Sequence, residues 1–566
     1  MISNRNCYFY VGLLILLFSC QERLEEKTAF GGKKYGGVFT YFSPEKTDVF
    51  FPLYSPTVYN QRVLSQIFEP LFILDEKGKI VPNLAKSINT TQDGKKVTIR
   101  LRNDVYFHDD DSFSGDLKMT AEDVKFSLSF ACSGNKWNSF GTLYRDKIEG
   151  GKIFYKQSAK QIPSNGVSGI KILNDSTIQL KLTDNFANFQ MLLAHPSLVV
   201  FSKDVFLKYK DDIIHHPIGT GPFLLQFSDN NQILLSRNEG YWKKDNYGNQ
   251  LPFLKEICIL NARGIRSEYH SFSHKKADIL FELPVDQLDD AFGSLTDAQK
   301  GKNLLHRVLV KNGTKINYLS FDCKSFPFNN PLVRKAFSLA IDRKRICLEA
   351  MNGDGNYTIN GFIPKNIYYA PNKFELLKYD PKSARILLQK AGFNKHNSFP
   401  RLTLYLNAQK GGISDKWSKE IIKQLKENIG IDLDINYCSL DQKHKAILSR
   451  KAKIWKSAWV PDYPDPDAYF RVFFGNKTSL ANEESNYNNF NNALFDSIYL
   501  ETLRTKDFKK RHTMMNTLDQ ILIENAAIVP IFAEDLFVIV NLRVRDFQIN
   551  NSGIIDFSRI YIKEVF

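Results

Sequence analysis

Two stretches in the first third of the chain alternate between apolar and polar side chains. Residues 97–102 (Val-Thr-Ile-Arg-Leu-Arg) and residues 178–182 (Ile-Gln-Leu-Lys-Leu) place every second side chain on an apolar face. A period of two is typical of a strand with one buried face, so we expect a strand in each stretch. Between them, Thr120 and Asp123 have the spacing of a capping box, and the apolar positions within 124–131 repeat at helical spacing. These features predict a helix that begins after Thr120.

The second half of the chain shows helices that alternate with strands. Asn330-Pro331 is the pattern of an N-cap residue with proline at the first helical position. Asp380-Pro381 repeats this pattern, and Gly392 is suited to the end of the second helix. Residues 415–428 form a third amphipathic run, which the alternating residues 431–435 follow. Helix followed by strand, repeated, predicts an α/β fold built in layers.

Residues 217–222 (Pro-Ile-Gly-Thr-Gly-Pro) place two glycines beside a threonine. Glycine lets a backbone pass close to a ligand or to a crossing strand. The stretch lacks the third glycine and the following helix of a dinucleotide-binding fingerprint, and it is not a phosphate loop. We therefore interpret it as a hinge or a crossover.

A proline-rich stretch near the C-terminal end is the main candidate for a binding site. Residues 459–466 (Trp-Val-Pro-Asp-Tyr-Pro-Asp-Pro) contain three prolines, which fix backbone φ and remove amide donors, so neither a helix nor a central strand can run through them. The resulting stiff loop presents two aromatic rings and two carboxylates, with Asp467 just beyond. Such a loop suits a site that holds an ammonium or guanidinium group between aromatic faces, although a turn capped by its own aspartates has the same composition.

Composition limits the classes of function. The chain has 566 residues, of which 43% are apolar and 13% aromatic, so it can bury a large core. Its length corresponds to roughly three or four domain-sized units. The formal net charge is +15, but the positive residues are dispersed and form no long basic block. Nucleic-acid binding needs a concentrated patch, so we expect no nucleic-acid partner and instead an attraction to anionic membrane surfaces.

The first twenty residues have the features of an export signal. Arg5 supplies a positive charge, Tyr8–Phe18 is an apolar run too short to cross a bilayer as a mature helix, and Cys20 follows a Leu-Phe-Ser triplet. The residues before this cysteine resemble the lipobox of bacterial lipoproteins. That resemblance implies a signal peptide at residues 1–19 and a lipid anchor and tether at residues 20–34. An ordinary secretory signal in which Cys20 is incidental is the alternative.

Neither a metal site nor a catalytic constellation is visible in the sequence. Five of the seven cysteines lie beyond Cys20, far apart and without a Cys-x-x-Cys pair, so we expect no disulfide-built scaffold. Residues 108–111 (His-Asp-Asp-Asp) lack a second ligand cluster, and we interpret them as a solvated strand end. No Gly-x-Ser-x-Gly, His-Glu-x-x-His or Cys/His arrangement occurs. The sequence therefore predicts no metal, no cofactor and no enzymatic activity.

A series of short motifs, in one order along the chain, resembles a known family. The motifs lie at residues 67–71 (Ile-Phe-Glu-Pro-Leu), 82–85, 105–109, 120–124, 217–223, 237–242 (Arg-Asn-Glu-Gly-Tyr-Trp), 333–337, 340–343, 379–381, 391–392 and 527–530. Together they resemble the extracellular solute-binding proteins of peptide ABC importers, the oligopeptide- and dipeptide-binding group of family 5. No single motif is strong, but so many in register are specific.

The resemblance implies a two-lobed periplasmic-binding-protein fold, type II and class C-like. In this fold two α/β lobes close on a ligand about a hinge, and an extra α/β domain is added. The implied limits are residues 35–60, 170–300 and 530–566 for a discontinuous lobe I, 61–169 for the extra domain and 301–529 for lobe II. Boundaries of this kind are placed to within about ten residues.

The resemblance also assigns roles to the proline-rich loop. In peptide-binding members, an aspartate in a Trp-x-x-Asp motif pairs with the α-amino group of the peptide, and residues 459–462 match that spacing. It implies that Asp462 binds the ammonium group, with Trp459 and Tyr463 as walls. Dipeptide binders hold the peptide carboxylate with an arginine roughly fifty residues earlier, and here that position falls near Lys410, a point charge without the bidentate fork. A solvated loop lysine is the alternative for Lys410.

The implied function is that of a substrate-binding lipoprotein that captures short peptides in a closing cleft. It would deliver them to the permease and ATPase subunits of an ABC importer. The protein would act as a monomer in the bacterial cell envelope, on the periplasmic or extracellular face of a membrane, held there by the lipid on Cys20. The same fold also serves nickel chelates, haem and glycans, and a sensor without transport is a further alternative, because fold does not determine ligand.

Overall fold

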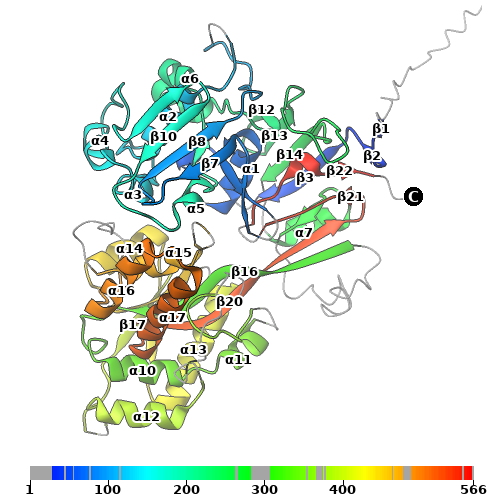
Figure 1. The fold of residues 1–566 in the computed structure, drawn as a ribbon. Helices are drawn as coiled ribbons and strands as arrows, with labels where there is room; N and C mark the ends of the chain where they lie inside the picture. Colours follow the sequence, from blue (N-terminus) through cyan, green and yellow to red (C-terminus); the bar gives the residue numbers. More distant parts are fainter. Residues whose placement is uncertain are drawn as a thin grey trace, which may run out of the picture.

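The protein consists of two α/β bodies joined by a pair of long strands (Figure 1). The computed structural model describes residues 28–563 except 44–45, 55–56, 76–77, 114–115, 262–264, 282–305, 352–354, 365–373, 375–377, 395, 409, 462, 464, 476–485 and 551–552. Cys20 and Asp462 lie outside the described residues. We call residues 28–281 with 542–563 the first body and residues 315–533 the second body.

One of two four-stranded sheets in the first body brings distant parts of the chain together. Its order is β12-β13-β14-β3, antiparallel except for the β14–β3 pair, in which Glu256 lies opposite Val38. Ile257 and Ile259 point into the hydrophobic core from β14. The strands are β3 (Val38–Ser43), β12 (Phe223–Ser228), β13 (Gln232–Arg237) and β14 (Glu256–Asn261).

The other sheet of the first body, β7-β8-β10-β9, is antiparallel and contains both strands predicted from alternation. Ile99 of β8 lies opposite Ile178 of β10, and both are fully buried. Helix α2 begins behind the predicted capping box of Thr120 and Asp123 and packs on this sheet. Two strands of this sheet, β9 and β10, lie beyond residue 169, which is the predicted end of the extra domain. The elements are β7 (Ala85–Thr90), β8 (Lys96–Leu101), α2 (Ala121–Ala131), β9 (Ile170–Asn174) and β10 (Thr177–Lys181).

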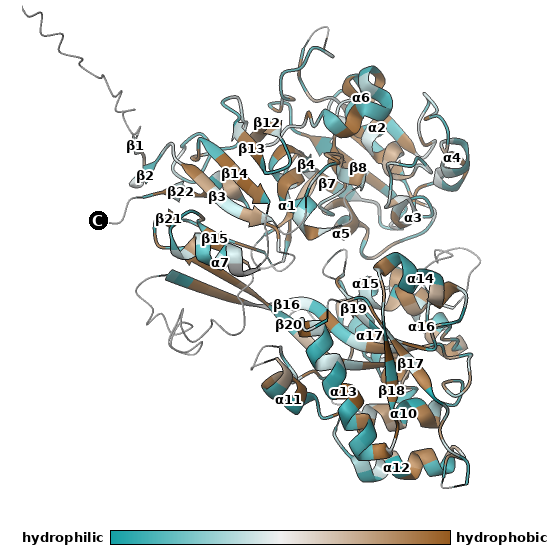
Figure 2. Cartoon of the chain, turned by 180° about the vertical axis from the view of Figure 1, so that it is seen from behind, coloured by the Kyte–Doolittle hydropathy of each residue, from teal (hydrophilic) through white to brown (hydrophobic). Residues whose placement is uncertain are grey.

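A six-stranded sheet forms the centre of the second body and extends along β20 and β16 to β15 of the first body. Its order is β15-β20-β16-β19-β17-β18, parallel where β17 meets β18 and β19 and antiparallel elsewhere. Figure 2 shows the apolar colour along β17, as along β13 and β14 of the first body, which agrees with strands buried in the cores. The strands are β15 (Ile279–Leu280), β16 (His306–Phe321), β17 (Leu402–Leu406), β18 (Leu433–Tyr437), β19 (Ile454–Trp459) and β20 (Ile528–Asn541).

Helices cover this sheet, and two of them begin as predicted. Asn330 and Asp380 cap α10 and α12, and a proline follows each cap. None of the helices in the described part of the chain combines the length and the apolar character needed to cross a bilayer. The main helices of the second body are α10 (Pro331–Leu339), α12 (Pro381–Lys390), α13 (Ile413–Ile429), α14 (Leu440–Leu448), α16 (Ala493–Arg504) and α17 (Phe508–Glu524).

Strands β16 and β20 run side by side from the second body to the first, where β15 joins them (Figure 1). Their register shifts between Lys311 and Lys315 and again after Asn317. Such bulges bend a strand pair locally, so the connection between the bodies contains built-in bends. At the first bulge, a Cβ atom added to Gly313 would lie 1.8 Å from the carbonyl oxygen of Glu534. The two backbones therefore approach too closely there for any side chain.

The Pro-Ile-Gly-Thr-Gly-Pro stretch is a backbone crossing. The amide of Gly221 donates to the carbonyl of Ile67 at 2.8 Å, and a Cβ atom on Gly219 would lie 2.0 Å from the same oxygen. The hydroxyl of Thr220 donates to the buried carboxylate of Glu69 at 3.2 Å. These glycines thus serve the contact between two chain segments, which was one of the two predicted uses.

The interpretation of residues 108–111 as a solvated strand end is wrong for His108. Its side chain is buried, and Nε2 lies 2.9 Å from the carbonyl oxygen of Gly221. Burial lowers the pKa of this imidazole to about 4. A neutral histidine can bridge two backbone segments here, and no local pattern around His108 indicates that distant partner.

Candidate ligand-binding site

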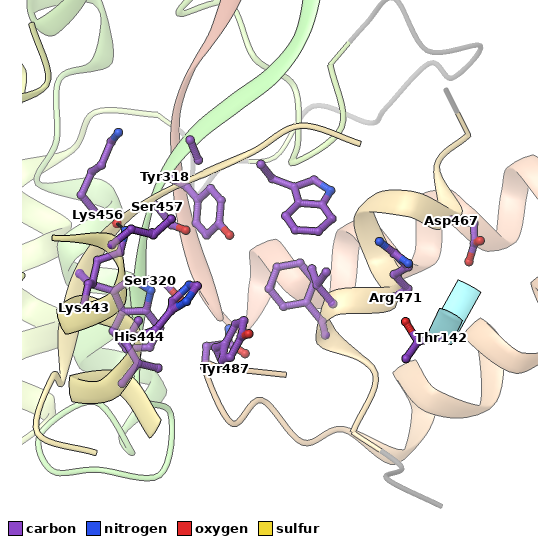
Figure 3. Close-up of a pocket in the computed structure, with 18 of the residues that line it drawn as sticks. Thr142, Tyr318, Ser320, Lys443, His444, Lys456, Ser457, Asp467, Arg471 and Tyr487 are labelled. Atoms are coloured by element: carbon purple, nitrogen blue, oxygen red, sulfur yellow. Dashed lines mark hydrogen bonds between the residues drawn. The ribbon is translucent and has the colours of Figure 1, made fainter. Parts of the chain in front are cut away.

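A cavity of about 400 Å³ lies where the two bodies face each other (Figure 3). The second body supplies most of its wall, from strands β16 and β19 and helices α14 and α16. The first body supplies Thr142, Leu143 and Lys147. We call it the inner cavity. Because each body closes one side of it, a ligand there is enclosed only while the two bodies are together.

A second cavity of about 700 Å³ adjoins the inner cavity on the side of the first body. The first body provides most of its wall, including Gln66, Met191 and His195, while Tyr463 contributes to both walls. The two cavities therefore meet at Tyr463, and we call them together the cleft. Cavities of this size are typical of sites for small organic ligands.

Strand β19 lines the inner cavity with one edge partly uncovered. It pairs with β16 along its whole length, Ile454–Trp459, but with β17 only at Ile454 and Trp455. Residues 456–459 therefore have no neighbouring strand on their second edge within the described chain, and all four line the cavity. An uncovered edge presents N–H and C=O groups that an extended peptide can pair with.

The loop that follows β19 is held firmly against the second body. Trp459 is half-buried, and its indole N–H donates to the carbonyl of Ala468 at 2.9 Å. The guanidinium group of Arg511 donates to both carboxylate oxygens of Asp465 at 2.7 and 2.8 Å. Such bidentate pairs fix geometry as well as charge, so the aromatic residues of the loop have defined positions.

Asp467 connects this loop to the first body. Its Oδ2 accepts hydrogen bonds from the hydroxyl of Tyr463 and from the side-chain amide of Asn188, the latter at 2.8 Å. Burial, reinforced by the nearby negative charge of Asp467, raises the pKa of the Tyr463 hydroxyl well above its ordinary value. Asn188 belongs to the first body, so this buried hydrogen bond spans the boundary between the two bodies.

The other end of the inner cavity has Lys443, Lys456 and His444 in its wall. In Figure 3 the side chain of Lys456 extends away from His444, and its ammonium group donates to the hydroxyl of Ser414 at 3.4 Å. The ammonium group of Lys443 donates to the side-chain oxygen of Asn407 and to the carbonyl of Lys456, the latter at 3.3 Å. His444 stacks on Tyr487 with ring centroids 5.5 Å apart. Burial lowers the pKa of both lysines to about 8.

Comparison with known proteins identifies the family. Residues 79–480 match the model of the family described as bacterial extracellular solute-binding proteins, family 5 Middle, which is more than half of the chain. This protein belongs to that family. As a member of family 5 it is an extracellular solute-binding protein, and the family is one of binding proteins, not of enzymes.

Family 5 relatives match along nearly the whole chain. The peptide transport periplasmic protein SapA of Salmonella typhimurium is 23% identical over 92% of this chain and 88% of its own length. The glutathione-binding protein GsiB of Salmonella typhi is 24% identical over 84% of this chain and 85% of its own length.

Solved structures confirm the two-lobed periplasmic-binding-protein fold. DppA of Helicobacter pylori, solved in complex with the peptide STSA, superimposes with a TM-score of 0.75 at 20% identity and covers 94% of this chain and 99% of its own. The Escherichia coli murein tripeptide binding protein MppA superimposes with a TM-score of 0.75 at 18% identity, covering 93% and 98%.

The structure brings together some of the residues predicted for the family 5 site. Trp459 and Tyr463 both line the inner cavity. Lys410 does not line either cavity of the cleft: it is exposed and lies over the ring of Tyr437, 5.1 Å from its centroid. The role of Asp462 stays a prediction, because this residue lies outside the described part of the chain.

Sequence reasoning missed two charged residues of the site. Nothing in the sequence distinguishes Lys443 from Lys445, which is two residues away on the same helix and exposed. Asp467 was noticed only as a residue beyond the loop. Its i, i+4 spacing from Tyr463 suits a local contact. Its contact with Asn188 depends on the tertiary fold.

Among the residues that the structure describes, no group of three or more potential metal ligands occurs.

Proposed function

We propose that this family 5 protein binds short peptides in the cleft and delivers them to an ABC importer in the membrane. The observation that supports this most directly is the uncovered edge of β19 at residues 456–459, which faces the inner cavity. A peptide in extended conformation can add to such an edge through main-chain hydrogen bonds, which are independent of peptide sequence. The relatives named as peptide-transport and peptide-bound proteins agree with this choice of ligand.

The two ends of the peptide need opposite charges. We assign the α-amino group to the loop after β19, where Asp462 is the predicted partner and Trp459 and Tyr463 are walls. Asp467 adds a second carboxylate to this end of the cavity. We assign the α-carboxylate to Lys443 in place of Lys410, because Lys443 lines the inner cavity and Lys410 lines neither part of the cleft.

The proposal includes the cellular setting. We propose that Cys20 carries the lipid anchor that holds the protein at a bacterial membrane, and that permease and ATPase subunits are its partners there. The motif before Cys20 and the names of ABC-transporter relatives support this setting. A structural neighbour, AgaA, was solved with agropinic acid, so a related fold accepts a ligand that is not a peptide. Ligand class therefore needs a direct test.

Calorimetry with blocked peptides provides that test. The mature protein is titrated with tri-alanine, with N-acetyl-tri-alanine and with tri-alanine amide. We expect the free peptide to bind, and each blocked form to bind at least about tenfold more weakly, because each lacks one end charge in a cavity that excludes water. If di-alanine, tri-alanine and a mixed library of short peptides all fail to bind or to raise the melting temperature, the proposal is wrong.

A further inference from the structure

The described wall of the inner cavity carries an excess of positive charge. Four cationic side chains line it, namely Lys147, Lys443, Lys456 and Arg471, but Asp467 is the one carboxylate in the same wall. The adjoining cavity differs, because its described wall holds three cationic side chains and four carboxylates. The excess is therefore confined to the inner cavity.

The excess is not spread evenly within the inner cavity. Figure 3 shows Asp467 at the same end as Arg471, and the negative charge of Asp467 also favours the charged form of Lys147. At the opposite end, neither Lys443 nor Lys456 forms an ion pair with any carboxylate that the structure describes. The negative charge of Glu534 acts on Lys456 from a distance, but the carboxylate of Glu534 forms its ion pair with Lys315, at 2.8 Å.

Lys443 is placed to receive an anion. Its side chain is 6% exposed and lines the inner cavity. An ammonium group has three N–H donors, and two of those of Lys443 are used by the oxygens of Asn407 and Lys456. The third N–H has no acceptor in the described structure. A buried cation without a counter-charge is unfavourable, which agrees with the lowered pKa of this lysine, so an anionic ligand group gains free energy here.

We propose that the cleft selects short acidic peptides whose last residue is aspartate or glutamate, and that the α-carboxylate and the side-chain carboxylate of this residue are both received at the end of the inner cavity formed by Lys443 and His444, with the positive charge of Lys456 nearby. This inference rests on the proposed function, since it specifies which peptides the site takes. When the peptide supplies only its α-carboxylate, the wall of the inner cavity still has an excess of positive charge. A second carboxylate, on the last side chain, reduces this excess further. His444 supplies an additional hydrogen-bond donor at this end.

Three matched tripeptides test the proposal on the mature wild-type protein. Ala-Ala-Glu and Ala-Ala-Gln have nearly the same shape and differ in charge, and Ala-Ala-Lys reverses the charge. In calorimetry we expect Ala-Ala-Glu to bind at least about tenfold more tightly than Ala-Ala-Gln, and Ala-Ala-Lys to bind most weakly. Equal binding of the glutamate and glutamine peptides, or tightest binding of the lysine peptide, overturns the inference and leaves the proposed function intact. Binding of none of the three contradicts the proposed function itself.

Two variants place the selectivity on Lys443. Lys443→Gln should reduce the preference for Ala-Ala-Glu over Ala-Ala-Gln to less than about threefold. Lys445→Gln, on the same helix but exposed and paired with Asp441, should keep the wild-type preference. If Lys443→Gln keeps the wild-type preference for Ala-Ala-Glu over Ala-Ala-Gln, another residue causes the selectivity and the proposed role of Lys443 is wrong. If this variant does not fold, as circular dichroism will show, the wild-type peptide series alone decides the question.

Discussion

Charged side chains of the cleft differ in how their charge is balanced. Asp465 is neutralised by a bidentate pair with Arg511, and Asp467 accepts two hydrogen bonds at one of its oxygens. Lys443 contacts only neutral oxygens. A zwitterionic ligand therefore meets carboxylates near the loop after β19 and an uncompensated ammonium group at the other end. This asymmetry orients a peptide with its carboxylate toward Lys443.

The first residue-level prediction concerns the ammonium end. Asp462→Ala should weaken binding of tri-alanine by about 3–5 kcal/mol, a loss of more than about a hundredfold in Kd, because an ammonium group enclosed without its counter-charge is costly. Calorimetry measures the loss, and Asp441→Ala, an exposed carboxylate on α14, is the control with expected wild-type affinity. If the Kd of Asp462→Ala is within threefold of the wild-type Kd, a residue other than Asp462 binds the α-amino group of the peptide.

The second residue-level prediction is a pH dependence. Burial holds the pKa of Lys443 at about 8, although the nearby Cys438 acts weakly in the opposite direction. A bound carboxylate favours the charged form and raises this pKa in the complex. The complex then keeps a proton that the free protein loses above pH 8, so affinity should fall as pH rises through 8, by about tenfold between about pH 7 and pH 9.

A control separates this effect from titration of the peptide. The α-amino group of the peptide loses its proton over the same range of pH, so wild type and Lys443→Gln are compared with the same peptide in calorimetry. The affinity of wild type should fall about tenfold more than that of the variant over that range. Equal losses in both proteins mean that Lys443 does not titrate with binding.

Some of these residues could be predicted from sequence, and others could not. Trp459 and Tyr463 stand in a proline-stiffened loop beside carboxylates, a pattern that is visible in one dimension. Lys443 is one surface-like lysine among many in the sequence, and only the packing of α14 against β19 buries it. The spacing that pointed to Lys410 locates a loop position, and the structure directs that side chain onto Tyr437 instead of into the cleft.

At the level of elements, the site depends on the unequal length of pairing around β19. Strand β16 covers one edge completely, whereas β17 leaves the strand after two residues. The same β16 pairs with β20 and connects the bodies. One strand thus both supports the binding edge and crosses to the first body, so closure of the cleft and formation of the site involve the same element.

The element-level prediction concerns the crossing of β16 and β20. Gly313→Ala should destabilise the protein by about 1–3 kcal/mol, because the new Cβ would lie 1.8 Å from the carbonyl oxygen of Glu534 and the strands must separate. Chemical denaturation measures the change. Gly240→Ala is the matched control, since its Cβ would meet its nearest neighbour, the side chain of Asn238, at 3.5 Å. Equal stability of the two variants would show that the crossing tolerates a side chain.

Local signals predicted the capped helices and the short strands well. Asn330, Asp380 and the Thr120–Asp123 capping box mark helix starts because the capping hydrogen bonds are local. Strand β16 is different. Its central Lys-Asn-Gly-Thr, at residues 311–314, has the composition of a turn and lies at the first bulge, and pairing with β20 on both sides of this bulge makes one continuous strand of the two halves.

At the level of the whole molecule, the two bodies touch beside the cleft. The amide of Ala187 donates to the carbonyl of Leu503 at 2.8 Å, and Asp184 forms an ion pair with Arg504 at 2.6 Å. The Asp184–Arg504 pair is partly exposed and so adds little free energy, which is compatible with bodies that separate and close about the β16–β20 connection. The Asn188–Asp467 hydrogen bond between the bodies is buried. The domain limits drawn from the sequence stay predictions. Strands distant in sequence pair across these limits, as β8 does with β10, and such pairing leaves no local signal in the sequence.

Native mass spectrometry of the gently purified protein, followed by denaturation to identify what was bound, shows directly which ligands the cleft holds. We expect a set of short peptides of mixed sequence bound one per protein molecule, with acidic C-terminal residues in excess. Their masses give the peptide length that the cleft accepts. A protein that is empty, and that gains no thermal stability from a library of short peptides, would contradict the assignment of peptides as its ligands.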